Sequence, residues 1–241
     1  SFSITSRIEE KIVVTSNQIL QLGPVVFPKF VGTARNCNML PFIMGALESI
    51  PTKYQAYAKA IQACKIPSKE IGQVGYLSIH ESWVKEGETQ RRPGIHTEGH
   101  RNTGWGGGGW GGGVSHGSGI YMASNVAKSC RAWDTCIVNP QELGDCEHLR
   151  DSLKNPINMK ENTLYWFTDR CPHEALPIVF HENIPQDLIT ILDDGNRYFK
   201  RQWFRVVTSA VDAWYEADST PNTNGITPPE SCRIIRGSKF D

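Results

Sequence analysis

The sequence predicts an α+β fold that is mainly β: a sandwich or barrel core with N-terminal helices packed on one side. Two observations lead to this prediction. Between residues 38 and 66 apolar side chains recur at helical spacing, with Pro51 as a break. From about residue 70 the chain changes to short β-like runs that are separated by turn residues. A helical segment followed by a series of strands favours a sheet-based core with helices on one face.

We expect a single domain over residues 1–241, because this length suits one β domain. A helical layer at about 38–66 precedes a β core at about 70–216 and an irregular, proline-containing tail at 217–241. The two expected helices rest on the spacing of Leu40, Ile43, Met44, Leu47, Ile50, Tyr54, Tyr57 and Ile61. Strands are expected at residues 73–80, 119–125, 136–138, 163–168, 175–180 and 203–215, and a further short helix at 183–192.

The composition narrows the class of protein. Lys and Arg total 25 and Asp and Glu total 25, so the chain has no net field that would attract nucleic acid or a membrane surface. No apolar run approaches the roughly 18 residues of a membrane-spanning helix. The seven cysteines form no C-x-x-C pair, which favours reduced thiols over a disulfide framework or a zinc knuckle. We therefore expect a cytoplasmic protein with a small-molecule substrate, and leave its oligomeric state open.

Residues 1–10 lack the charged and then apolar pattern of a signal peptide. Since the first residue is not Met, a trimmed targeting segment is left open.

The segment His96-Thr97-Glu98 carries the clearest chemical signal in the chain. On an extended strand, residues i and i+2 point to the same face, so His96 and Glu98 can bind one ion together. A plausible third ligand is His173, which follows Pro172 and a β-like run, 75 residues after Glu98 (173 − 98). Two imidazoles and one carboxylate make the facial triad of non-heme Fe(II) oxygenases, which leaves coordination positions open.

The order H-x-E, a long insertion, a Pro-His pair and then an Arg-bearing strand resembles the Fe(II)/2-oxoglutarate-dependent oxygenases over about residues 73–215. The resemblance implies a double-stranded β-helix core, a jelly-roll relative of the cupins. It also implies that the catalytic metal ligands are His96, Glu98 and His173. The implied cofactor is Fe(II), with 2-oxoglutarate and O2 as co-substrates. The enzyme would be a dioxygenase that hydroxylates, desaturates or cyclises a small organic substrate through an Fe(IV)-oxo intermediate.

The same resemblance places the anchor for 2-oxoglutarate on the last core strand. Arg205 and Arg201 are four residues apart, so on a strand both point to one face. Arginine offers a planar fork that binds a carboxylate with two hydrogen bonds. We favour Arg205, because it lies in an apolar run where an unpaired charge would be costly, and take Arg201 second. Tyr121 and Asn125 are further candidates for the co-substrate pocket.

Residues 104–113 form a near-continuous glycine run that contains Trp105 and Trp110 and begins six residues after Glu98. Glycine-rich linkers seldom carry large apolar rings, so we interpret this Trp–glycine segment as an active-site loop or lid rather than a passive linker.

Three alternatives to the oxygenase stay open. A Zn-dependent hydrolase would use His96, His100 and either Glu98 or His116, with an open fourth position that activates water. A cupin-type metal enzyme would use the same triad without 2-oxoglutarate. A non-catalytic jelly-roll binding module would bind no metal and would use the Trp–glycine segment as an aromatic platform.

Overall fold

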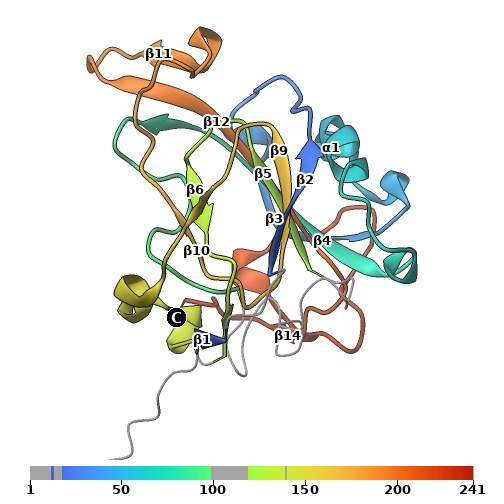
Figure 1. Ribbon diagram of the computed structural model, residues 1–241. Coiled ribbons are helices and arrows are strands. Elements are labelled where there is room, and N and C mark those ends of the chain that lie inside the picture. Colours follow the sequence, from blue (N-terminus) through green and yellow to red (C-terminus); the bar gives the residue numbers. More distant parts are fainter. Residues whose placement is uncertain (1–11, 14–17, 99–118, 139, 241) are drawn as a thin grey trace, which may run out of the picture.

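The computed structural model describes residues 12–13, 18–98, 119–138 and 140–240. Its largest unit is a seven-stranded antiparallel sheet with the order β2-β9-β5-β12-β4-β3, in which β11 also pairs with β12 (Figure 1). These strands are β2 (Ile19–Pro24), β3 (Cys37–Ile43), β4 (Val74–Lys85), β5 (Ile120–Ser124), β9 (Thr163–Phe167), β11 (Ile189–Ile191) and β12 (Arg197–Val207).

A smaller antiparallel sheet has the order β10-β6-β8, with β10 at His173–Ala175, β6 at Cys130–Ala132 and β8 at Ile157–Asn158. An isolated bridge between His96 and His173 extends this sheet by one short segment. Two separate strand pairs complete the described strands: β1 (Ile12–Val13) with β7 (Cys136–Ile137), and β13 (Ala213–Tyr215) in parallel with β14 (Arg233–Ile235). The prediction of a mainly β fold is therefore confirmed.

Helices are few and short. The one α-helix of the described residues, α1, spans Ala58–Gln62. The 3-10 helices are Thr33–Arg35, Leu47–Ser49, Thr52–Tyr57, Ser68–Glu70, Glu142–Gly144, Glu147–Ser152, Gln186–Leu188 and Glu216–Asp218. None of these helices is long and apolar enough to cross a membrane.

The predicted helix before Pro51 is wrong, because residues 38–43 belong to the strand β3, which pairs with β4, and only the 3-10 helix Leu47–Ser49 follows before Pro51. The side chains of β3 are buried on both faces, Met39, Leu40 and Phe42 among them, so the sequence shows no period-two alternation that would indicate a strand. The second predicted helix exists in part, as the 3-10 helix Thr52–Tyr57 followed by α1. This short helical layer packs on one face of the large sheet.

Three other predictions need correction. Residues 183–192 contain only the 3-10 helix Gln186–Leu188 and then β11, since the edge of β12 is available for pairing. Residues 176–180 hold no strand, and β10 precedes them at His173–Ala175. The run 203–215 is two strands, β12 and β13, because β12 ends at Val207.

Strand β12 lies between β4 and β5 and separates two cores. Its residues Trp203 and Val207 belong to the core between the large sheet and the small one, together with residues of β6. Phe204 and Val206 belong to the core beneath the helical layer. This alternation is the period of two expected of a strand, and it sends Arg201 and Arg205 toward the small sheet, on the side of Trp203.

The substitution Phe204→Ala is expected to destabilise the fold by about 3–5 kcal/mol, because it empties a fully buried site. The Phe204 ring lies 5.8 Å from that of Phe27 and 6.1 Å from that of Tyr57, centroid to centroid. Urea unfolding followed by circular dichroism measures the loss. Val179→Ala, at a 62% exposed position, is the control and should change stability little. Equal stability of the two variants would contradict the assignment of this core.

Candidate metal centre

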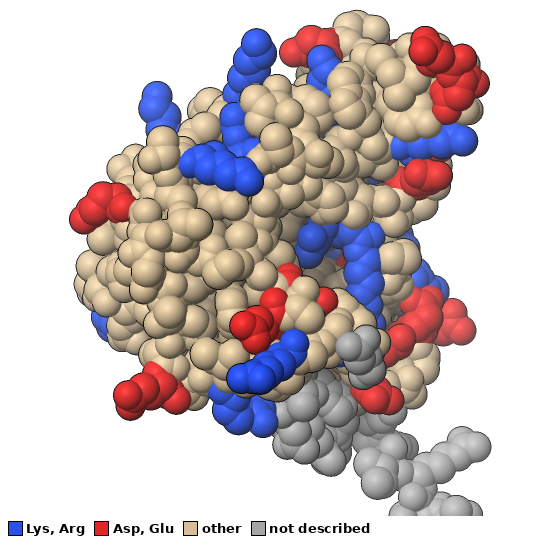
Figure 2. Space-filling view, turned by 180° about the vertical axis from the view of Figure 1, so that it is seen from behind, with Lys and Arg blue, Asp and Glu red and all other residues tan. Residues whose placement is uncertain are grey.

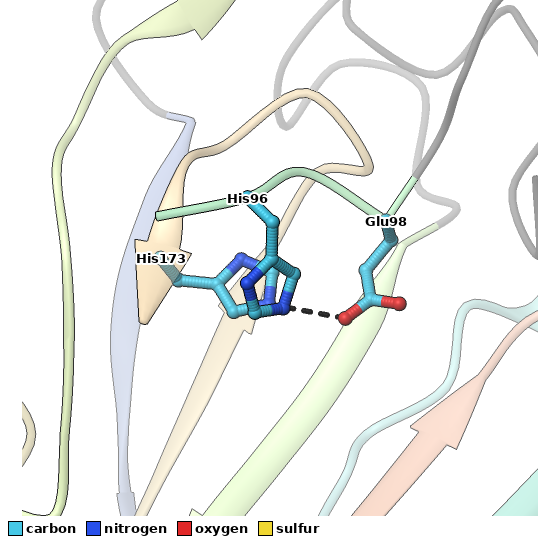
Figure 3. Close-up of side chains that lie close together, drawn as sticks. All are labelled: His96, Glu98 and His173. Atoms are coloured by element: carbon cyan, nitrogen blue, oxygen red, sulfur yellow. Dashed lines mark hydrogen bonds and ion pairs between the residues drawn. The ribbon is translucent and has the colours of Figure 1, made fainter. Parts of the chain in front are cut away.

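His96, Glu98 and His173 converge at one point (Figure 3). Each offers one ligand atom, and these atoms all lie within 4.8 Å of one another. The Nε2 atom of His173 is 3.0 Å from Oε1 of Glu98, and the two imidazole rings lie 4.5 Å apart between centroids. The structure thus brings together the three residues that the sequence nominated, and the cluster has room for a metal ion.

Backbone pairing places these side chains. The amide of His96 donates to the carbonyl of His173 and the amide of His173 donates to the carbonyl of His96, both at 3.0 Å. The next two amides of the segment donate to Gly144 (from Thr97, 2.9 Å) and to Asp169 (from Glu98, 3.1 Å). The extended conformation buries Thr97 on one side, so His96 and Glu98 share the other.

Each imidazole is oriented by the backbone carbonyl of the residue two positions before it. Nδ1 of His96 lies 2.8 Å from the carbonyl oxygen of Gly94, and Nδ1 of His173 lies 3.0 Å from that of Cys171. A carbonyl can only accept, so Nδ1 is the donor in each ring, and Nε2 is the ring atom left to bind a metal. Burial, reinforced by His173, lowers the pKa of His96 to about 3, which keeps this ring neutral.

The carboxylate of Glu98 is ionised. Burial by itself raises the pKa of this group, but the Arg205 guanidinium and His173 beside it outweigh burial and hold the pKa well below its usual value. Arg205 Nη1 donates to Glu98 Oε2 at 3.2 Å. A neutral imidazole and an ionised carboxylate are the protonation states in which these groups bind divalent metals. The residues present therefore fit a divalent cation.

A cavity beside the three ligands is rich in arginine. It is lined by Arg91, Arg92, Arg201 and Arg205, by the ligands, and by Met122, Cys130, Ala175 and Trp203. On the face drawn in Figure 2, Lys and Arg side chains also gather along the wall of a hollow, with acidic side chains on its rim. Because the chain as a whole is neutral, this concentration of positive charge is a local property of the site.

Arg205 and Arg201 have different surroundings. Arg205 is paired with Glu98, and its Nη2 atom donates to Ser78 (3.3 Å) and Asn38 (3.4 Å). Arg201 is 1% exposed and binds two neutral oxygens: Nε donates to Ser124 at 3.2 Å, and Nη1 donates to Gln90 at 3.0 Å. Within the described part of the chain no carboxylate lies within 4.0 Å of Arg201. Burial lowers its pKa to about 10.

Tyr121 and Asn125 do not reach this cavity. Tyr121 is buried in the core beneath the helical layer, and the Asn125 amide donates to the carbonyl of Lys200 on another side of β12. The residues of β5 that face the site are Met122, in the cavity lining, and Ser124, which contacts Arg201. The sequence-based choice of Tyr121 and Asn125 was therefore displaced by one position along the strand.

Sequence reasoning missed several residues of the site: Asn38, Gln90, Arg91, Arg92 and Lys239. The pair Arg91-Arg92 has the composition of a solvated loop, and only tertiary packing reveals that it lines the cavity. The Trp–glycine segment, His100 and His116 lie outside the described residues, so the predicted loop and the zinc alternative gain no structural description.

The C-terminal tail contributes the last missed residue. Lys239 is 7% exposed and lines a second cleft, which shares His96 and Glu98 with the arginine-rich cavity. Burial lowers the pKa of Lys239 from its usual 10.5 to about 8, although the charge of Glu98 raises it. An ammonium group is thus held in a place where its charged form is disfavoured.

Comparison of this chain with protein-family models, with curated proteins and with solved structures finds no match.

The substitution Gly144→Ala is expected to weaken metal binding by about 10- to 100-fold, as loss of a supporting contact around a metal site does. A Cβ atom at Gly144 would lie 2.3 Å from the carbonyl oxygen of Thr97, which sits between His96 and Glu98. Titration of the protein with Fe(II) or Co(II), followed by metal analysis, measures the affinity.

Gly225→Ala is the matched control for this variant. Gly225 also has a positive φ, +84° against +77° for Gly144, but nothing lies within 4 Å of its added Cβ. Both variants therefore carry backbone strain, and only Gly144→Ala disturbs the metal ligands. Equal metal affinity of the two would contradict the supporting role of Gly144.

The substitution Lys239→Met is expected to stabilise the protein at neutral pH and to lose this advantage as the pH rises. A lowered pKa means that the folded chain releases the Lys239 proton near pH 8, while the unfolded chain keeps it to about 10.5. The cost of the buried charge, at most about 3 kcal/mol, is thus present below pH 8 and disappears between pH 8 and 10.5. Urea unfolding of both proteins from pH 7 to 10.5 measures the difference. Lys160→Met, at an exposed position, is the control. A stability difference between the wild type and Lys239→Met that does not change with pH would refute the argument.

Proposed function

We propose that this protein is a non-heme Fe(II)- and 2-oxoglutarate-dependent oxygenase that oxidises a small organic substrate. One observation carries the proposal: two histidines and a carboxylate converge beside a buried arginine that has no carboxylate partner among the described residues. The two histidines and the carboxylate suit an iron with open coordination positions. The buried arginine suits the far carboxylate of a dicarboxylic co-substrate.

The strand order supports a double-stranded β-helix core. In the large sheet β4, β12, β5 and β9 are neighbours, and in the small sheet the His96 segment, β10, β6 and β8 are neighbours. Along the chain these strands alternate between the sheets, except that β6 and β8 follow each other in the small one. Such winding of two facing four-stranded sheets is that of a jelly roll. The ligands lie on neighbouring strands, at the His96 segment and at the start of β10.

In this proposal His96, Glu98 and His173 hold Fe(II), with both Nε2 atoms and one carboxylate oxygen turned to a common point. When bound, the metal supplies activation of O2 coupled to oxidative decarboxylation of 2-oxoglutarate. Arg205 keeps Glu98 ionised and fixes its second oxygen, so that this carboxylate is oriented before any metal arrives.

The surroundings favour Arg201 over Arg205 as the anchor for 2-oxoglutarate, which reverses the order taken from the sequence. Arg205 is already committed to Glu98, at the level of the metal ligands. A 2-oxo acid that chelates a metal directs its other carboxylate away from that metal. Arg201 lies four residues before Arg205 in β12, and its side chain is held by Ser124 and Gln90, with no acidic partner among the described residues. A bidentate carboxylate would satisfy this buried cation.

Apolar side chains around the ligands support oxidative chemistry by limiting the access of water. The Phe167 ring lies 4.9 Å from that of His173, and Met122 and Trp203 line the cavity. Exclusion of water protects a reactive centre from side reactions and strengthens the ionic contacts inside it.

The test is to add Fe(II) and 2-oxoglutarate anaerobically and to measure visible absorption, in which a chelated 2-oxo acid gives a weak charge-transfer band. The wild type should develop the band and His173→Ala should not. Arg201→Met should weaken binding of 2-oxoglutarate by about 10- to 100-fold, because a charged hydrogen-bonded pair contributes about 1.5–3 kcal/mol. Arg236→Met removes an exposed arginine and is the control.

The other outcomes separate the alternatives. Iron binding without the band would favour a cupin-type enzyme that does not use 2-oxoglutarate. Stoichiometric zinc that resists exchange by iron would favour a hydrolase, and absence of any metal would favour a binding module. Retention of the band in Arg201→Met with its loss in Arg205→Met, at equal iron content, would return the anchor to Arg205.

A further inference from the structure

A second cleft opens beside the metal ligands, on the side of the C-terminal tail. It shares Arg91, Arg92 and Arg205 with the arginine-rich cavity, and Lys239 adds a further cation from the tail. Its acidic residues are Glu98, which is paired with Arg205, and Asp218. The cleft is therefore a mouth to the candidate metal centre in which four cationic side chains face two carboxylates.

The tail is fastened so that Lys239 stays in this mouth. The Asp218 carboxylate accepts the backbone amide of Lys239 at 2.6 Å and the hydroxyl of Ser238 at 3.0 Å. Asn38 in turn donates through Nδ2 to the Asp218 carbonyl at 2.7 Å and exchanges two bonds with Thr220. Asp218 thus fixes the turn that carries Lys239.

Two further cations of the mouth, Arg91 and Arg92, contact a carbonyl and an aromatic ring. Arg92 donates through Nη1 to the carbonyl of Leu143 at 3.0 Å, and the guanidinium of Arg91 lies 4.0 Å from the centre of the Trp203 ring. Among the residues that the structure describes, no carboxylate lies within 4.0 Å of either arginine. Like charges gathered in one cleft repel each other, and a bound anion removes that repulsion.

We propose that Arg92 and Lys239 form an anion subsite at the outer mouth, and that the substrate of this protein carries a carboxylate or phosphate group which binds there. The inference rests on the proposed function in one respect, namely that the anion belongs to the molecule being oxidised. It assigns the two anion-binding regions to different ligands: Arg201, in the inner cavity, receives the co-substrate, and the outer pair receives the substrate.

Calorimetric titration with sodium sulfate tests the subsite directly. Sulfate is a dianion at all relevant pH values and a weak metal ligand, so the full-length chain is titrated without metal and again, anaerobically, with Fe(II) and 2-oxoglutarate. Ionic strength is held constant with NaCl. We expect sulfate to bind in both states, and its affinity to fall by about tenfold in Arg92→Met and in Lys239→Met. Arg92→Lys and Lys239→Arg should retain most of the affinity.

Arg236→Met is the matched control, because it removes one positive charge from an exposed position of the same tail. It should bind sulfate like the wild type. Thermal unfolding of every variant identifies any that fail to fold, and the charge-conserving variants then decide the matter. Absence of sulfate binding in the wild type would overturn the proposal. So would loss of binding in Arg201→Met with retention in Arg92→Met and Lys239→Met, because the anion would then sit in the inner cavity.

The titration without metal separates this inference from the proposed function. If sulfate binds at Arg92 and Lys239 but no charge-transfer band forms with Fe(II) and 2-oxoglutarate, the subsite stands and the oxygenase assignment falls. If the band forms and sulfate does not bind, the oxygenase assignment stands and the anionic substrate class is overturned. Where both hold, carboxylic acids should stimulate consumption of 2-oxoglutarate and their primary amides should not.

Discussion

Two reciprocal backbone hydrogen bonds between His96 and His173 hold the site together. They join segments that are 77 residues apart (173 − 96), and they fix the relative position of both imidazoles to within the reach of one ion. Since each bond uses a main-chain group, the pairing does not consume the side chains that it positions. Glu98 follows from the same pairing, because the strand period of two returns it to the side of His96. Every other feature of the centre is arranged around these three residues.

Strand β12 links this centre to the fold. One of its faces carries Phe204 and Val206 into the core beneath the helical layer, so the strand is anchored in a buried apolar core. The opposite face presents Arg201 and Arg205 beside the metal ligands. A buried guanidinium is costly unless it is paired, and a strand fixed on both edges by β4 and β5 is rigid enough to hold two of them. The apolar core thus helps to hold two buried guanidinium groups in place.

The parts of the site that depend on local geometry could be predicted from the sequence. The pairs His96/Glu98 and Arg201/Arg205 are separated by two and four residues, and an extended chain returns both members of each pair to one face. Choices that depend on strand register could not be predicted. Tyr121 was chosen where Met122 faces the site, since the pairing of β5 with β12 decides which residues of β5 point inward. The same limit applies to Lys239, which only the folded tail brings to the metal ligands.

The fold, like the site, has elements that could be predicted from the sequence and elements that could not. Runs with clear turn boundaries, such as 73–80 and 163–168, correspond to β4 and β9. The expected helix before Pro51 is the strand β3, because burial on both faces removes the alternation that distinguishes a strand from a helix in sequence. An alternating pattern indicates that one face of a strand is buried. Strand β3 has both faces buried: Met39 belongs to the core between the two sheets, and Leu40 and Phe42 belong to the core beneath the helical layer.

Charge balance connects the two proposed anion-binding regions to the candidate metal centre. The described residues that line the two cavities offer two carboxylates, Glu98 and Asp218, against Arg91, Arg92, Arg201, Arg205 and Lys239. A divalent cation bound by His96, Glu98 and His173 adds to this excess, so binding of the metal alone increases the repulsion within the pocket. Each anion that binds in the pocket lowers this electrostatic repulsion. Metal, co-substrate and an acidic substrate are therefore expected to bind more tightly together than separately, since each anion removes a repulsion that the metal has increased. If the proposed function holds, the cationic side chains make the pocket complementary to the complete set of proposed ligands rather than to the metal alone.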